Sequence, residues 1–318
     1  MRKKDKMKRV IQNVCICGRG AVGLTFGELF HQYLGKEHFA FIVDQPRKER
    51  YQNQVVTMNG KPIKFHYICP ESPEDHDFQA DLVIFACKSY SLDQAMQQVK
   101  PFLHEQTILM SAINGMASED RLEQQFPSLQ VIHTIAQNMD TRYDPTCQQG
   151  TCTTRGELVF GAIDQQRKDA AHAIEELFDR CHIPSQHSQQ ILLDQANKLM
   201  FNCGINQVCA AYQVTYGMVA QIPQYHQIFC QAMEEARMVL NQKGYAITED
   251  MLNDWVKRVE TFDPDSMPSM AQDLQYQRPV ELDLFAGTII PWAKQCGVRV
   301  KVMEDLKQRI ETRIQNKH

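Results

Sequence analysis

The stretch VCICGRGAVGLTFGELF, Val14–Phe30, places three glycines between an apolar run and a segment with helical periodicity. Val10–Cys17 is apolar and partly β-branched, which predicts a buried strand. Ala21–Leu34 carries apolar side chains at helical spacing, and Gly35 is suited to end that helix. Because glycine is costly inside a regular element, glycines at this junction need a physical reason.

The three glycines Gly18, Gly20 and Gly23 form a G-x-G-x-x-G pattern. The pattern alone is weak, and a turn with structural glycines is the alternative. A strand before it, a helix after it and an acid at the end of the next strand favour a dinucleotide site. The glycines would then permit, in order, the tight turn, the approach of a pyrophosphate and close helix–strand packing. The phosphates would bind at the helix N-terminus, and the expected cofactor residues are Gly18, Arg19, Gly20, Ala21, Val22 and Gly23.

The residues after the second predicted strand, Phe39–Val43, give conflicting signals about the cofactor. Asp44 lies where a carboxylate accepts the ribose 2′-hydroxyl of NAD. Arg47 and Lys48 follow closely and could instead bind a 2′-phosphate. The alternative is that these basic residues, with Arg50, are only the solvated start of a helix.

The order of predicted elements divides the chain near residue 189. Up to that point strands alternate with helices, which predicts an α/β domain with a Rossmann-type, doubly wound parallel sheet. Beyond it the pattern is all-helical, with helices expected at Ile191–Tyr212, Gln224–Lys243, Glu249–Glu260, Val280–Gln295 and Val302–Ile314. We therefore expect a dinucleotide-binding domain over residues 1–189 and a helical domain over 190–318.

Composition excludes several classes of function. The 318 residues are 43% hydrophobic and carry a net charge of −4, which gives no general attraction to nucleic acid or membranes. The basic start Arg2–Arg9 is not followed by a signal-peptide pattern. The 11 cysteines include no C-x-x-C pair, which favours reduced thiols in a cytoplasm and gives no metal site. The sequence leaves a monomer or a homodimer open.

Polar residues follow two further predicted strands. Lys88 comes directly after Leu82–Cys87, and Asn114 with Gly115 follows Thr107–Ala112. Ligands bind doubly wound sheets at the carboxyl ends of their strands. For Asn114 and Gly115, the alternative is an Asn-Gly pair that only forms a turn.

The segment DQANKLMFNCGINQ places three polar residues on one helical face. Lys198, Asn202 and Asn206 recur at every fourth position. Asparagine is a poor helix former and is unusual on a solvated face. The spacing therefore indicates fixed hydrogen-bonding groups, whereas an ordinary polar surface is the alternative.

With these motifs together, the sequence resembles the ketopantoate reductase family over nearly its whole length. The resemblance is carried by GRGAVG, CK, NGM, KLMFNCGIN and SMAQDLQYQRPVELD. It implies a Rossmann-type domain, a helical second domain and the NADPH-dependent reduction of the C2 carbonyl of a small 2-keto acid.

The resemblance also implies roles for individual residues. Lys198 corresponds to the proton donor. Glu281 completes the site and would orient Lys198 or bind a substrate hydroxyl, and it is also an expected cofactor contact. Lys88 lies near the cofactor, and Asn114 touches both cofactor and substrate. The other implied substrate-binding residues are Asn202, Asn206 and Ser269. The resemblance implies NADPH, and among the basic residues that follow Asp44 the expected contact of NADPH is Arg47.

Two positions depart from the family's pattern. Tyr216 precedes Gly217 where members often have asparagine, and Ser266 replaces another common asparagine. Both positions concern contacts with the substrate. We expect ketopantoate to remain a substrate, but with a weaker preference over 2-keto acids that lack its hydroxyl. The alternatives are a related reductase of another 2-keto acid and a protein that senses NADP(H) without turnover. A sensor would not need Lys198, Asn202, Asn206, Ser269 and Glu281 together.

Overall fold

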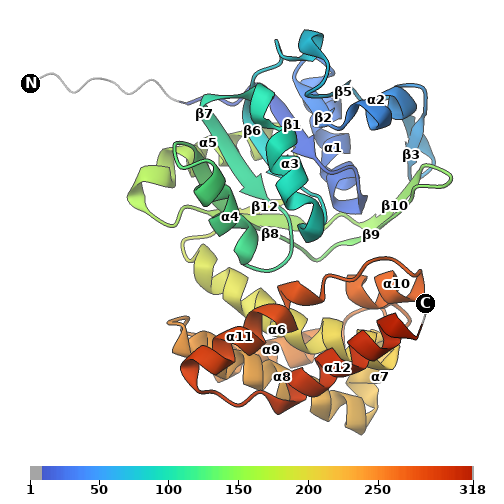
Figure 1. Ribbon diagram of the computed structural model, residues 1–318, viewed down its shortest axis with the longest axis vertical. Coiled ribbons are helices and arrows are strands. Elements are labelled where there is room, and N and C mark those ends of the chain that lie inside the picture. Colours follow the sequence, from blue (N-terminus) through green and yellow to red (C-terminus); the bar gives the residue numbers. More distant parts are fainter. Residues whose placement is uncertain (1–8, 317–318) are drawn as a thin grey trace, which may run out of the picture. The chain divides into compact units, whose positions relative to one another are not determined.

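The computed structural model describes residues 9–316, and the chain divides into two compact units after Ile191 (Figure 1). Residues 2–8 of the basic start lie outside the described residues. Within 9–316, no helix combines the length and apolarity that a membrane span requires. All eleven cysteines lie inside that range, and all are free thiols.

The first unit is built on a mostly parallel eight-stranded sheet in the order β12-β11-β8-β7-β6-β1-β2-β5. Only β8 and β11 pair antiparallel among its described strands. β1 and β2 are buried at every residue, as expected for strands covered on both faces. The strands are β1 Val14–Cys17, β2 Phe39–Ile42, β5 Tyr67–Ile68, β6 Ala80–Phe85, β7 Leu103–Ser111, β8 Gln130–Gln137, β11 Glu157–Gly161 and β12 Ser185–His187.

Helices connect these strands (Figure 1), and side chains of both helices and strands form the core of the first unit. Phe30 of the first helix is fully buried between Phe39 and Phe178, with ring centroids 5.8 and 6.2 Å away. Burial of such aromatic side chains is the main stabilising contribution. The helices are α1 Ala21–Leu34, α2 Gln45–Gln52, α3 Leu92–Gln98, α4 Ala117–Gln125 and α5 Lys168–Arg180.

A second, four-stranded sheet in the order β4-β3-β10-β9 belongs to the same unit. Its strands are β3 Val56–Met58, β4 Lys61–Ile63, β9 Asp140–Asp144 and β10 Gln149–Thr154. It is joined to α1 by the hydroxyls of Thr25 and Thr141, 2.8 Å apart, and by an Arg155–Glu28 ion pair of 2.7 Å. The sequence patterns did not predict this sheet, because β9 and β10 are short and rich in polar residues.

The second unit is helical in its described part. Its longest helix, α6 Ile191–Tyr212, begins at the division and is buried along most of its length. At Gly204 an added Cβ would lie 2.7 Å from Met233 and 2.8 Å from Phe229, so only glycine allows this packing of α6 on α8. The other helices are α7 Tyr216–Gln221, α8 Pro223–Gln242, α9 Glu249–Val259, α10 Ser269–Gln275, α11 Ala286–Cys296 and α12 Lys301–Gln315.

The predicted fold class, a Rossmann-type α/β unit followed by a helical one, is confirmed. The predicted bounds of α1 and α6 are also confirmed. The helix expected at Val280–Gln295 is wrong in its first half. There the chain makes a 3₁₀ turn, Leu282–Leu284, and Phe285 leaves helical geometry at φ −115° and ψ −88° before α11 begins.

Candidate functional site

The glycine loop between β1 and α1 is shaped by close backbone contacts. Gly18 has φ +116°, and a Cβ there would lie 2.5 Å from the backbone of Ala86 and Cys87 at the end of β6. At Gly23 a Cβ would lie 1.9 Å from the carbonyl oxygen of Gly18. These two glycines therefore fix the turn and the approach of α1 to the loop.

Gly20 lies in more open surroundings than Gly18 and Gly23. It is exposed at the N-cap of α1, and an added Cβ would meet no atom within 4 Å. No side chain caps this described helix end, so the backbone amides of Ala21, Val22 and Gly23 are directed towards the N-terminus of the helix. An open, uncapped helix N-terminus beside a glycine fits the pyrophosphate of a dinucleotide.

Arg19 turns its side chain into a cluster of tyrosines. Its guanidinium lies 3.9 Å from the ring centre of Tyr51 and bonds to the hydroxyl of Tyr143 and to Gln148 at 3.2 and 2.8 Å. Burial raises the pKa of nearby Tyr67 to about 12, so that phenol stays neutral at physiological pH. The Arg19 side chain therefore joins the loop to the smaller sheet.

Asp44 and Arg47, which gave conflicting signals in the sequence, contact one another. Asp44 is the N-cap of α2, where its carboxylate accepts from the Arg47 amide at 2.9 Å. The Arg47 guanidinium lies 3.1 Å from the same carboxylate. Lys48 instead pairs with Asp75 at 2.5 Å. Arg47 is thus the basic group beside Asp44, whereas Lys48 is engaged within the fold.

Lys88 and Asn114 stand at the carboxyl ends of neighbouring strands. Lys88 follows β6 and Asn114 follows β7, and both are half-buried. β6 pairs with β1 and with β7 in parallel, so both residues lie at the same sheet edge as the glycine loop. Gly115 has φ +91°, as expected for the glycine of a turn. A contact of Asn114 with cofactor or substrate remains a prediction.

Lys198 lies on α6 in the second unit and is half-buried. Burial lowers the pKa of its ammonium group to about 8, because a charged amine loses solvation there. A free lysine has a pKa of about 10.4 and is a poor acid near neutrality. A fraction of this amine is therefore neutral near physiological pH, unlike that of a free lysine.

The two asparagines on α6 are buried and hydrogen-bonded to each other. Asn206 donates to Asn202 at 3.0 Å and accepts from the backbone amide of Met270 at 3.3 Å. Both keep only about a twentieth of their surface exposed, at 6% and 5%. The second bond brings the N-terminus of α10, which begins with the exposed Ser269, to the asparagine pair. These asparagines are fixed groups, and Asn206 also holds α10 in place.

Glu281 is half-buried just before the 3₁₀ turn Leu282–Leu284. It follows α10 along the chain and precedes α11. Its proposed contact with Lys198 or the substrate remains a prediction.

Tyr216 and Ser266, the two departures from the family pattern, are paired through their backbones. The amide of Tyr216 donates to the carbonyl of Ser266 at 3.0 Å, and Gly217 does the same to Pro264 at 3.0 Å. The Tyr216 ring packs edge-on against Phe262 at 5.1 Å. The two substitutions therefore affect one local surface of the second unit.

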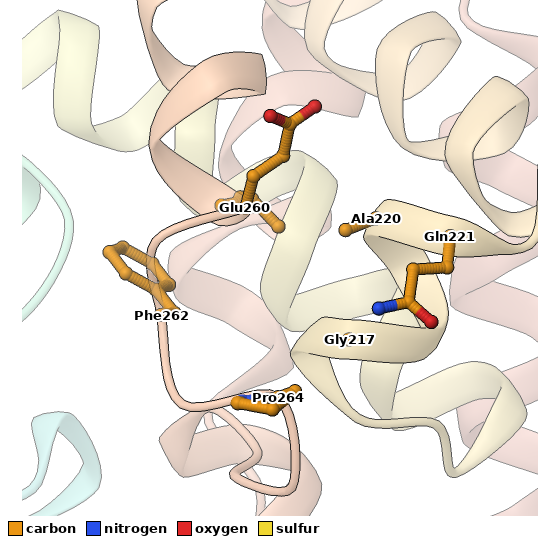
Figure 2. A pocket seen from close by; sticks show the side chains of 7 residues that line it. Gly217, Ala220, Gln221, Glu260, Phe262 and Pro264 are labelled. Atoms are coloured by element: carbon orange, nitrogen blue, oxygen red, sulfur yellow. The ribbon is translucent and has the colours of Figure 1, made fainter.

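A pocket that the sequence did not indicate lies beside that surface. Figure 2 shows Ala220 and Gln221 on α7 at one side and Glu260, Phe262 and Pro264 on the segment after α9 at the other. A Cβ at Gly217 would lie 2.7 Å from Pro264. No local motif spans these two segments, so only their association in the fold could reveal the pocket.

Comparison with known proteins agrees with these features. The family model "Ketopantoate reductase PanE/ApbA" matches residues 14–165, and the model of that family's C-terminal domain matches residues 190–313. A 2-dehydropantoate 2-reductase of Vibrio cholerae is 25% identical over 303 residues, which cover 94% of this chain and 97% of the relative.

Two solved structures share the fold. A PanE/ApbA family ketopantoate reductase from Ralstonia eutropha has a TM-score of 0.81 at 22% identity and covers 96% of this chain and 100% of its own. A D-mandelate dehydrogenase, solved with NADH and anilino(oxo)acetate, has a TM-score of 0.84 at 20% identity, with 96% and 98% covered. On both family models and the shared architecture, this chain is a member of the ketopantoate reductase family.

Proposed function

We propose that this protein uses NADPH to reduce the C2 carbonyl of 2-dehydropantoate (ketopantoate), which yields pantoate. The observation that carries the proposal is Lys198, an amine with a pKa of about 8, one helical turn from the buried Asn202–Asn206 pair. Membership in the ketopantoate reductase family and the open glycine loop support a reductase that binds a dinucleotide. Pantothenate biosynthesis is the pathway that this reaction implies, and reduced cysteines favour the cytoplasm.

The proposal assigns a task to each group, and Asn114 serves both cofactor and substrate. The amides at the start of α1 bind the pyrophosphate, with Lys88 and Asn114 near the cofactor. Bound there, the reduced nicotinamide supplies a hydride. Lys198 donates its proton to the oxygen that becomes negative at C2. The substrate's carboxylate and hydroxyl are bound by neutral donors and by one acid: Asn114, Asn202, Asn206, Ser269 and Glu281.

The activity is expected to fall as the pH rises through about 8, because only protonated Lys198 can donate. Above that value kcat/KM for keto-acid reduction should decrease about tenfold per pH unit. The check is a pH profile at saturating NADPH, with Lys198→Arg as the matched variant. Arginine stays protonated, so any residual activity of that variant should lack the alkaline decline. A wild-type profile that is flat to pH values well above 8 would contradict the role of Lys198.

The cofactor preference is expected to depend on Arg47. Arg47→Ala should raise the KM for NADPH by about 10-fold and leave that for NADH nearly unchanged, since an exposed charge-assisted bond is lost. Arg50→Ala is the matched control, because Arg50 is an exposed basic residue of the same helix. If wild type prefers NADH, Asp44 binds the 2′-hydroxyl and the NADPH assignment is wrong.

The preference for ketopantoate over ketoisovalerate, which lacks the hydroxyl, is expected to be weak. A site that hydrogen-bonds a substrate hydroxyl discriminates by up to about 10⁴-fold. Tyr216 and Ser266 replace two amides on one surface, although both still carry hydroxyls. The check is kcat/KM for both acids with NADPH in excess. A strong preference would show that the two substitutions are neutral.

The other candidate function is reduction of a different 2-keto acid. It is favoured by the same paired substitutions and by the fold shared with a D-mandelate dehydrogenase. A higher kcat/KM for an aryl-substituted 2-keto acid than for ketopantoate would support this second candidate function. Binding of NADPH without turnover of any 2-keto acid would instead select the sensing role.

A further inference from the structure

Two histidines and a glutamate gather at the edge of the large sheet, away from the glycine loop. His172 and Glu175 lie on α5, and His187 is the last residue of β12. One oxygen of Glu175 lies 3.2 Å from Nδ1 of His172 and 3.0 Å from Nδ1 of His187. In the sheet order, four strands separate β12 from β1. The proposed reduction gives this cluster no role.

The two distances from Glu175 to the histidine nitrogens suit a small divalent cation. All three ligand atoms lie within 4.8 Å of one another. Zinc binds imidazole nitrogen and carboxylate oxygen at about 2.0–2.2 Å, so the ligand atoms of a tetrahedral site are roughly 3.3 Å apart. The two observed N···O distances are within a few tenths of an ångström of that spacing. Two imidazoles and one carboxylate also form a donor set that zinc prefers.

His187 is held in position by the core of the first unit. Its ring stacks on that of Phe160 with centroids 5.2 Å apart and planes at 14°, and Phe160 is fully buried. Phe160 and His187 are partners in the β11–β12 register, and the next amide, Ser188, bonds to Phe160 at 2.8 Å. His172 and Glu175 are neighbours on one face of α5. The three ligands thus come from rigid elements, which lowers the cost of ordering them.

The site is also reachable from solvent. The side chains of His172 and Glu175 are 64% and 41% exposed, whereas that of His187 is 12% exposed. A cation entering from solvent would keep a water molecule at its remaining position.

We propose that His172, Glu175 and His187 form a binding site for Zn²⁺ or a similar divalent transition-metal ion, which ties β12 to α5. The alternative is a surface cluster in which the histidines only share the carboxylate, an arrangement worth little to stability. Binding to the folded protein would raise its resistance to unfolding.

The test is titration of the chelator-treated full-length protein with Zn²⁺, followed by calorimetry and by thermal unfolding. We expect one site per chain, and a Tm that rises with Zn²⁺. His172→Gln and Glu175→Gln should each weaken binding by more than about 10-fold, since even groups that only support a ligand are worth 10–100-fold. They should also abolish the rise in Tm. Glu176→Gln is the matched control, because Glu176 is an exposed glutamate on the same helix.

Cobalt distinguishes this site from binding at a thiol such as the exposed Cys147. Co²⁺ should give the visible bands of nitrogen and oxygen ligation, which disappear in His172→Gln and persist in Glu176→Gln. A thiolate-to-cobalt charge-transfer band would place the metal elsewhere and overturn the proposal. Equal Zn²⁺ affinity in wild type and both ligand variants, or no binding by wild type, would also overturn it.

Discussion

Replacing Lys198 by alanine is expected to lower kcat for ketopantoate reduction by about 10²–10⁴-fold, the usual contribution of general acid catalysis. In the proposed reaction the Lys198 ammonium group, with a pKa of about 8, donates the proton that the new hydroxyl needs. Alanine leaves that oxygen to be protonated by water. Because the proposed contact of Lys198 is the substrate carbonyl and not the dinucleotide, the affinity for NADPH should change little.

The matched control is Lys257→Ala, which removes an exposed lysine of α9 in the same unit. It should leave kcat, KM and the Tm close to those of wild type. NADPH binding, followed by its fluorescence, confirms that Lys198→Ala retains the cofactor site. Near-normal turnover by Lys198→Ala would contradict the assignment of the proton donor.

Gly20→Ala is expected to lower the affinity for NADPH alone, whereas Gly23→Ala is expected to lower both that affinity and the Tm. At Gly20 the added methyl group enters open space above the N-terminus of α1, so the fold is unaffected and a phosphate is kept from the amides. Hydrogen bonds to a charged group contribute about 1.5–3 kcal/mol each, so NADPH affinity should fall by roughly 10–100-fold per bond lost.

At Gly23 the methyl group would lie 1.9 Å from the carbonyl of Gly18, which neither backbone segment can accommodate without a shift. Overpacking of this kind costs about 1–3 kcal/mol, so the Tm should fall as well as the cofactor affinity. Equilibrium NADPH binding and thermal unfolding of both variants separate the two effects. If Gly20→Ala binds NADPH as wild type does, the glycine loop is a structural turn and not the pyrophosphate site.

The parts of this fold that could be predicted are those in which local pattern and packing agree. Val14–Cys17 is apolar because the strand is covered on both faces, and α1 has helical periodicity because one of its faces lies on the sheet. The β9–β10 pair was missed, since polar strands lack that signal. Contacts between residues distant in the sequence stabilise them, such as the hydroxyls of Thr25 and Thr141.

The candidate site shows the same division. The spacing of Lys198, Asn202 and Asn206 was sufficient to predict one helical face, because the periodicity of a helix is fixed. That Asn206 also accepts from Met270 depends on the return of α10, which no local pattern encodes. The tyrosines around Arg19 and the ligand set of His172, Glu175 and His187 likewise become visible only when separate elements meet.

The central claim is that this chain is a reductase of ketopantoate, and the most direct measurement is NADPH oxidation by the purified full-length protein with and without that acid. The account predicts loss of NADPH absorbance only when ketopantoate is present, with one pantoate formed for each NADPH consumed. NADPH that binds to the protein yet is not oxidised in the presence of ketopantoate would contradict the account.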